Sequence, residues 1–300
     1  MSTPADDYLA AALAIIEQHA MHRARIDWPT LRLAATRHAV GASTPADTYD
    51  TIRWVLTQLQ DGHSFFDPPD RGEIAIASGA YDQEATVPNG HLRTDRIAYL
   101  QVPAFRGSPQ HGTRYADALQ TQIAQLDTAD PVGWMVDLTE NSGGNMWPML
   151  AGLGPLLGEG PLGSFDFPNQ PPAIWSYRAG QACFDDFALA QTSNGGYHLR
   201  KIAPPVALLT TTRTASSGEA VLVAFCGRPN TCRFGTPTRG LTTANEGFPL
   251  PDGATISVTV ATFVDRLGRV YGQAIAPDQY VDGDEHQIQT RAAAWIHANR

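Results

Sequence analysis

Apolar runs that are each followed by a turn and a helix constrain the fold of this chain more than any other feature. Residues 133–138 and 206–211 have the composition of buried strands, and helices are predicted after them over 147–157 and 220–226. Buried strands that alternate with helices indicate βαβ crossovers over a largely parallel sheet, so the sequence predicts an α/β fold. The same patterns predict strands over 97–102, 233–236 and 256–263, helices over 115–126 and 288–297, and Gly- and Pro-rich loops over 158–172.

The N-terminal part of the chain shows helix-start signals rather than the apolar runs of buried strands. Thr3-Pro4 and Thr44-Pro45 begin the same signal, in which Thr is the N-cap, Pro the first helical residue, and an Asp follows in the first turn. Trp28 opens another helical stretch between them. The sequence therefore predicts an N-terminal helical cap over 1–66 and an α/β core over 67–300.

The charge of the chain excludes several classes of partner. The net charge is −9 and the basic residues form no block, so neither nucleic acid nor an anionic membrane surface is an expected partner. No apolar stretch is long enough for a membrane span, and residues 1–7 show no signal-peptide pattern. We therefore expect a cytoplasmic protein; its oligomeric state stays open, and a homo-oligomer is one option.

The cysteines give no sign of a metal site. Cys183, Cys226 and Cys232 lack metal-like spacing, and we expect buried thiols in a reducing compartment. A disulfide between Cys226 and Cys232 stays open. Neither a metal ion nor a cofactor is expected.

A serine between a buried strand and a helix start is the candidate nucleophile. Residues 214–219 read TASSGE, which places Ser216 and Ser217 at this junction. Backbone N–H groups at such a position point at negative charge that develops beside the hydroxyl. The alternative is an ordinary helix cap, because Ser and Thr are favoured there.

Two further segments carry groups that such chemistry needs. His63, in the DGHS segment 61–64, has the near-neutral pKa of a general base, and its alternative is a surface turn. Gly143 and Gly144, in the NSGG segment 141–144, let the backbone approach a substrate closely. They fit an oxyanion hole or a tight turn, and they lack the spacing of a phosphate-binding loop.

Together these segments resemble the tail-specific (C-terminal-processing) and tricorn-core serine peptidases. DGHS is similar to the D-x-H-S/T segment of the tricorn side, residues 137–144 to D-L-R-x-N-x-G-G, and TASSGE to T-A-S-A/S-x-E. Residues 235–240 match the G-x-P-T-x-G turn, and residues 275–278 match the closing segment that ends in P-D. The resemblance implies a ClpP/crotonase-like spiral core with Ser216 as nucleophile and His63 as base. It also implies an oxyanion hole built from Gly143 or Gly144 together with Ser217.

The chain departs from the family pattern in three places. Leu241 stands where the tail-specific branch has its catalytic lysine, and Lys201, the one lysine of the chain, precedes the strand that leads to Ser216. A Ser-His rather than a Ser-Lys mechanism is therefore expected. The segment between Asp67 and Ile97 is too short for the PDZ module of tail-specific members.

The third departure concerns the group that orients His63. The tricorn side has a serine directly before the histidine and a glutamate near the closing motif, where this chain has Gly62 and Tyr271. The orienting residue stays open among four candidates, which are Tyr271, Asp61, Asp265 and Glu246.

The predicted function is that of a serine peptidase or hydrolase acting on a peptide or a small acyl substrate. One alternative is a catalytically weak or inactive binding protein of the same fold for a hydrophobic ligand or a peptide, because the orienting group is unassigned. The other is a crotonase-type acyl-CoA enzyme, which the acidic charge and the single lysine disfavour.

Overall fold

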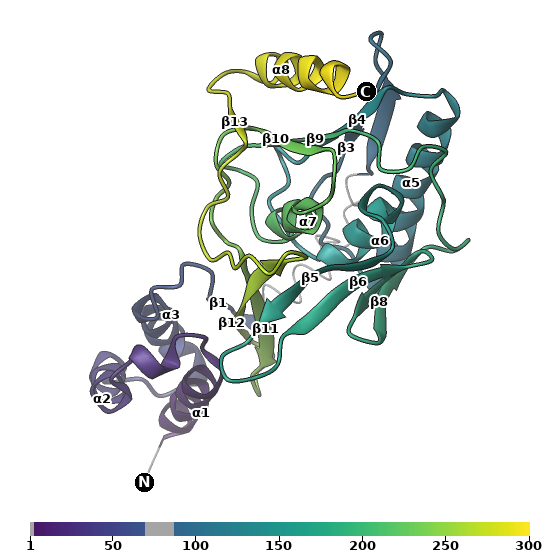
Figure 1. Cartoon of the computed structure of the whole chain (residues 1–300). Coiled ribbons are helices and arrows are strands. Elements are labelled where there is room, and N and C mark those ends of the chain that lie inside the picture. Colours follow the sequence, from purple (N-terminus) through teal and green to yellow (C-terminus); the bar gives the residue numbers. More distant parts are fainter. Residues whose placement is uncertain (1–2, 70–86) are drawn as a thin grey trace. The chain divides into compact units, whose positions relative to one another are not determined.

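The computed structural model describes residues 3–69 and 87–300 (Figure 1). The chain divides into two compact units. Unit 1 comprises Met1–Ala80, Phe167–Gln170 and Thr243–Ala261, and unit 2 comprises Tyr81–Asp166, Pro171–Thr242 and Thr262–Arg300.

Unit 2 is built on a six-stranded sheet in the order β13-β10-β9-β4-β3-β2. The strands are β2 (Asn89–Leu92), β3 (Ile97–Gln101), β4 (Gly133–Asp137), β9 (Val206–Thr210), β10 (Thr231–Gly235) and β13 (Gln279–Tyr280). All neighbours run parallel except β2 and β3. The largely parallel sheet predicted from the buried strands is confirmed, and with it the α/β class.

Helices cover both faces of this sheet. Helix α8 (Glu285–Ala298) packs on one face, and the opposite face carries α5 (Pro109–Thr128), α6 (Met146–Leu157) and α7 (Ser217–Phe225) (Figure 1). Alternate strand residues such as Met135, Leu209 and Phe234 form a core with Ile288 and Ile296 of α8. Helix α5 begins earlier than predicted, because Ser108 accepts a hydrogen bond from the N–H of His111 and caps it.

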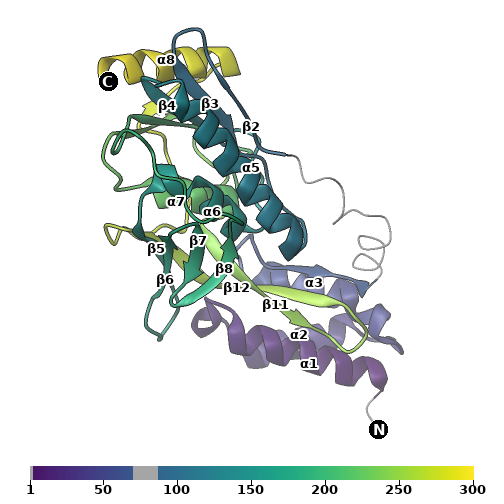
Figure 2. The same cartoon turned by 90° about the vertical axis from the view of Figure 1, so that its right-hand side faces the viewer.

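A second, antiparallel sheet in unit 2 was not predicted. It contains β5 (Gly160–Asp166), β6 (Ala173–Arg178), β7 (Gln181–Phe184), β8 (Phe187–Gln191) and the end of β12 (Thr255–Asp265). Helices α6 and α7 lie between the two sheets (Figure 2).

The expectation of loops over 158–172 is therefore wrong in part, because strand β5 occupies residues 160–166. Its glycines and prolines conceal a strand, irregular between Pro161 and Gly163, in which Leu162 and Phe165 are buried. A side chain at Gly163 would meet the carbonyl oxygen of Val264 at 2.6 Å, so the glycine permits close strand pairing. The ClpP/crotonase-like arrangement of the core stays a prediction.

The described residues of unit 1 form the α-helices α1 (Pro4–His19), α2 (Trp28–His38) and α3 (Tyr49–Gln58). It also holds the 3-10 turns η1 (Arg23–Arg25) and η2 (Pro45–Thr48), the strands β1 (Phe65–Asp67) and β11 (Thr243–Pro249), and the start of β12. Thr3 caps α1 as predicted, whereas the Thr44 signal starts η2, which leads into α3. Tyr8 and Tyr49 donate hydrogen bonds to Asp252, which ties α1 and α3 to the turn between β11 and β12.

All three cysteines are free thiols, so Cys226 and Cys232 form no disulfide. Among residues 3–69 and 87–300, no cluster of His, Cys, Asp and Glu could hold a metal ion. In the same described ranges, no helix combines the length and the apolar character that a membrane crossing requires.

Candidate active site

Ser216 adopts a backbone conformation that an ordinary helix cap does not need. It precedes α7 with φ +52° and ψ −116°, whereas an N-cap residue is normally extended. A non-glycine residue at positive φ costs on the order of 1–3 kcal/mol and persists only where its surroundings impose it. The strand β9, this turn and α7 form a strained strand–turn–helix junction that presents the serine at its apex.

The buried carboxylate of Glu219 fixes this conformation. One oxygen, Oε2, accepts hydrogen bonds from the N–H of Ser216 at 2.8 Å and of Leu241 at 2.8 Å. The other, Oε1, accepts from the Thr238 hydroxyl at 2.5 Å and the N–H of Gly240 at 2.8 Å. Burial raises the pKa of Glu219 above its ordinary value, and these hydrogen bonds oppose the shift. Glu219 thus joins the start of α7 to the turn over 236–240.

Hydrogen bonds also join the Ser216 turn to the segment after β4. The hydroxyl of Thr214 donates to the carbonyl of Leu138 at 2.8 Å, and the N–H of Ala215 donates to the carbonyl of Asn141 at 3.0 Å. The side-chain amide of Asn141 donates to the carbonyl of Val102 at 3.0 Å. The two segments therefore form one hydrogen-bonded assembly.

Neighbouring atoms lie so close to the backbone of Gly143 and Gly144 that a side chain at either position would collide with them. Gly143 has φ +102°, and a side chain there would meet Cβ of Ser216 at 2.8 Å. Gly144 has φ +110°, and a side chain there would meet the carbonyl oxygen of Phe105 at 1.9 Å. The backbone thus runs directly beside Ser216, as an oxyanion hole requires.

The hydrogen bonds distinguish among the predicted oxyanion donors. The N–H of Gly143 donates to Oδ1 of Asn141 at 3.0 Å and is occupied. The N–H groups of Gly144 and Ser217 have no hydrogen-bond partner among the described residues. The Ser217 hydroxyl donates to the carbonyl of Gly144 at 2.5 Å, so Ser217 offers its N–H rather than its oxygen.

His63 lies in unit 1 on a network formed by β11 and β12. Its Nδ1 lies 2.7 Å from Oγ1 of Thr243, and its carbonyl accepts from the side chain of Asn245 at 2.7 Å. The adjacent Ser64 hydroxyl accepts from the N–H of Thr259 at 2.9 Å. Burial lowers the pKa of His63 from its ordinary value, and the charge of Asp61 opposes the shift. The direction of the shift favours the neutral imidazole, which is the form that a general base needs.

Thr243 contacts the His63 ring, and the sequence did not single it out. Of the four candidates, Asp61 lies nearest in the chain, but it accepts from the N–H groups of His63 and Ser64 rather than from the ring. The Tyr271 hydroxyl donates to Asp265 at 2.9 Å in unit 2, and Glu246 is exposed. Thr243 is an ordinary strand threonine, so only its tertiary hydrogen bond reveals it.

Two residues are relevant to a Ser-Lys mechanism, Leu241 and Lys201, and both contact residues other than Ser216. Leu241, at the position of the tail-specific lysine, donates its N–H to Glu219. Lys201 forms an ion pair with Asp130 at 2.7 Å and donates to the carbonyl of Pro131 at 3.1 Å.

Comparison with known proteins gives a consistent result. The model of peptidase family S41 matches residues 96–281, which include Ser216 and Gly144 but not His63. A nisin-resistance protein of Lactococcus lactis subsp. lactis is 25% identical over 291 residues, covering 96% of this chain and 86% of that protein.

Solved structures share the fold at lower identity. A lipoprotein from Streptococcus agalactiae has a TM-score of 0.81 at 21% identity, covering 100% of this chain and 98% of that chain. The photosystem II D1 C-terminal processing protease has a TM-score of 0.64 at 15% identity, covering 96% of this chain and 97% of that chain.

Proposed function

The chain belongs to peptidase family S41, and from this premise we propose that Ser216 is the nucleophile of a serine peptidase with His63 as its general base. The observation that carries the proposal is the strained backbone of Ser216, which the buried Glu219 holds beside the glycines of the NSGG segment. The Ser216–Glu219 pair also forms a capping box, but a serine that served only as a helix cap would need neither the positive φ nor the close approach of Gly143.

The proposed reaction follows the acyl-enzyme route. Nε2 of His63 takes the proton of Ser216 while Oγ attacks the carbonyl carbon of the scissile bond. The N–H groups of Gly144 and Ser217 then stabilise the oxyanion, and His63 returns the proton to the leaving amine. Water, activated by His63, attacks the acyl-enzyme and releases the second product.

Thr243 supports the tautomer that this route needs. When its Oγ1 accepts from Nδ1–H, Nε2 carries the lone pair that receives the proton. A neutral hydroxyl stabilises the imidazolium less than a carboxylate would, so we expect slower acylation than in a Ser-His-Asp enzyme. This feature favours the second candidate function, a catalytically weak or inactive binding protein of the same fold.

The relative named for nisin resistance makes nisin the first substrate to test. Purified protein is incubated with nisin and with a peptide library, and mass spectrometry detects new termini. Ser216 is probed separately with a fluorophosphonate, which marks an activated serine. The wild type is expected to cleave peptide and to carry the label on Ser216.

Four variants sharpen this test. Ser216→Ala and His63→Ala should each abolish hydrolysis. Ser217→Ala should keep the label, because the Ser217 hydroxyl is bound to the Gly144 carbonyl, and His198→Ala should behave as wild type, because His198 is exposed. Hydrolysis that survives in both of the first two variants contradicts the assignment. A wild type that neither labels nor cleaves favours the binding protein.

A further inference from the structure

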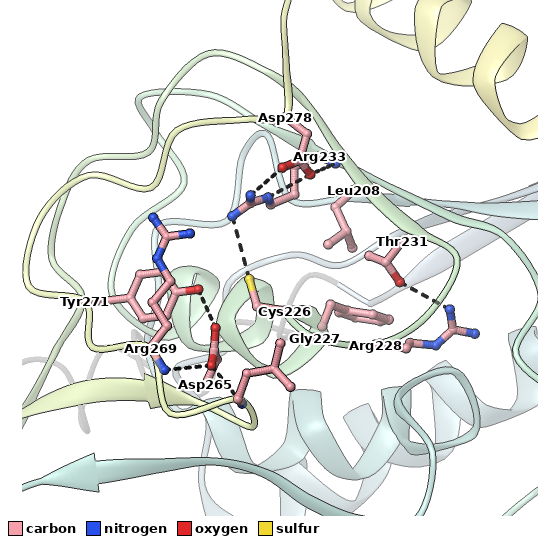
Figure 3. Close-up of a pocket in the computed structure, with 12 residues that line it drawn as sticks. Leu208, Cys226, Gly227, Arg228, Thr231, Arg233, Asp265, Arg269, Tyr271 and Asp278 are labelled. Carbon is pink, nitrogen blue, oxygen red and sulfur yellow. Dashed lines mark hydrogen bonds and ion pairs between the residues drawn. The ribbon is translucent and has the colours of Figure 1, made fainter.

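A cavity of about 260 Å³ lies at the end of α7 opposite Ser216 (Figure 3). Ser216 precedes α7, whereas Cys226 directly follows it and lines the cavity, so the helix separates the two sites. Every lining residue belongs to unit 2. The charged ones are Arg228, Arg233, Arg269, Asp265 and Asp278.

The carboxylates of the cavity are occupied. Asp278 accepts hydrogen bonds from Arg233, from Nε at 3.0 Å and from the backbone N–H of the same arginine at 2.9 Å. Asp265 accepts from the Tyr271 hydroxyl at 2.9 Å and from the N–H groups of Leu267 and Arg269. Figure 3 shows the guanidinium of Arg233 directed at the sulfur of Cys226, to which it donates at 3.7 Å. The charge of Asp278 is already balanced by Arg233, and both oxygens of Asp265 are engaged by hydrogen bonds, so these carboxylates do not favour a cation.

Arg228 adds a positive charge that no described carboxylate balances. It is 8% exposed, and it donates to the carbonyls of Leu156 and Pro204 and to the Thr231 hydroxyl. The neighbouring Arg266 likewise donates to carbonyls, and its buried Nε has no partner in the described part of the chain. The surroundings of the cavity therefore carry an excess of positive charge, although the whole chain is acidic.

Arg269 supplies unused donors at the edge of the cavity. Its guanidinium lies 5.6 Å from the centre of the Tyr271 ring and makes no hydrogen bond or ion pair with a described residue. A planar guanidinium presents paired N–H donors that match the oxygens of a phosphate or a carboxylate.

We propose that this cavity is a binding site for a small oxyanion, a phosphate or a carboxylate, which Arg269 holds at its edge. The excess of arginine favours an anion over a cation or a neutral ligand. The cavity volume fits a small molecule rather than a chain segment. The site is independent of Ser216, so it stands or falls separately from the proposed peptidase activity.

Cys226 provides a direct readout of occupancy. It is half-buried and lines the cavity, whereas Cys183 and Cys232 are buried. The full-length protein is treated with N-ethylmaleimide while inorganic phosphate, and separately succinate, is titrated against chloride at constant ionic strength. Modification at Cys226 is followed by mass spectrometry. At ten times its dissociation constant, a bound anion should slow the reaction about tenfold, by mass action.

Two variants decide the outcome. Arg269→Gln should weaken the anion about tenfold or more, because it removes a charge-assisted pair. Arg114→Gln, which changes an exposed arginine on α5 outside the cavity, should leave the affinity unchanged. Saturable protection by either anion that Arg269→Gln weakens supports the site, and the tighter anion identifies the chemistry. Absence of protection by both anions, or equal protection in Arg269→Gln, overturns the proposal.

Discussion

Two replacements of Glu219 should affect the stability of the protein and the reactivity of Ser216 to different extents. The carboxylate is fully buried and accepts four hydrogen bonds, three of them from backbone N–H groups. Glu219→Ala removes every acceptor at once and leaves buried donors unpaired. Glu219→Gln keeps the volume and one oxygen, which we expect to stay on the N–H groups of Ser216 and Leu241. The amide NH2 then faces the Thr238 hydroxyl, which can rotate, and the N–H of Gly240, which cannot.

The number of hydrogen bonds lost sets the expected decrease in the free energy of unfolding. In Glu219→Gln one backbone N–H loses its acceptor, at about 1–3 kcal/mol, and the remaining bonds weaken because the acceptor is neutral. Removal of a buried charge offsets part of the loss, so the free energy of unfolding should fall by about 2 kcal/mol. Glu219→Ala should cost about 4 kcal/mol, as expected when a buried charged network is broken.

Urea denaturation measures the stability, and the rate of fluorophosphonate labelling measures the reactivity of Ser216. Glu219→Gln should label at nearly the wild-type rate, because the Ser216 N–H keeps its acceptor. Glu219→Ala should label about a hundredfold more slowly, because the serine is no longer held in position. The control is Glu246→Gln, which changes an exposed glutamate and should alter neither quantity. Wild-type stability and labelling in Glu219→Ala would refute the reasoning.

Three further predictions test the surrounding geometry. Gly144→Ala should destabilise the protein by about 3 kcal/mol or more and abolish labelling, because its Cβ would lie 1.9 Å from the Phe105 carbonyl oxygen. Gly158→Ala, at a positive φ with open space around it, should cost only about 1 kcal/mol in the same urea assay. Thr243→Val should lower kcat/KM about tenfold through loss of one neutral hydrogen bond to His63, and Thr243→Ser should restore it. In the proposed mechanism the neutral form of His63 is active, and burial lowers its pKa, so kcat/KM should rise with pH through a value below the ordinary histidine pKa. Thr243→Asp should move this rise to higher pH, because a carboxylate stabilises the imidazolium.

The parallel sheet could be predicted because its strands are buried on both faces. Residues of β4 and β9 are buried without interruption, and this produces the continuous apolar runs that the sequence shows. Strand β5 could not be recognised in the same way. It pairs closely with its neighbours through Gly163, and its burial pattern depends on which residues face the aromatic cluster of Phe165 and Trp175. Glycine-rich composition normally indicates a loop, and tertiary packing overrides it here.

The residues of the candidate site also differ in whether the sequence could reveal them. Gly143 and Gly144 could be singled out because their positions need a backbone conformation that favours glycine, and Ser216 because it stands between a buried strand and a helix start. Thr243 could not, because a strand threonine is common and its role comes from a hydrogen bond between residues far apart in the chain. Motifs therefore record the strained backbone of a site better than they record the partners of its side chains.

This distinction bears on how the chain departs from its relatives. The parts of the site that depend on backbone geometry are all present, and they lie within the stretch that the S41 family model matches. The proposed base, His63, and its partner Thr243 act through their side chains, and both the proposal and the contact lie outside what the family model tests, because His63 is outside the matched stretch. A histidine whose partner is a neutral threonine polarises a serine less than a histidine whose partner is an aspartate. The backbone N–H groups of an oxyanion hole do not depend on which partner the histidine has. If the mechanism is as proposed, variants of Gly144 should therefore lose more activity than variants of Thr243, because they remove an oxyanion donor rather than a neutral partner of the base.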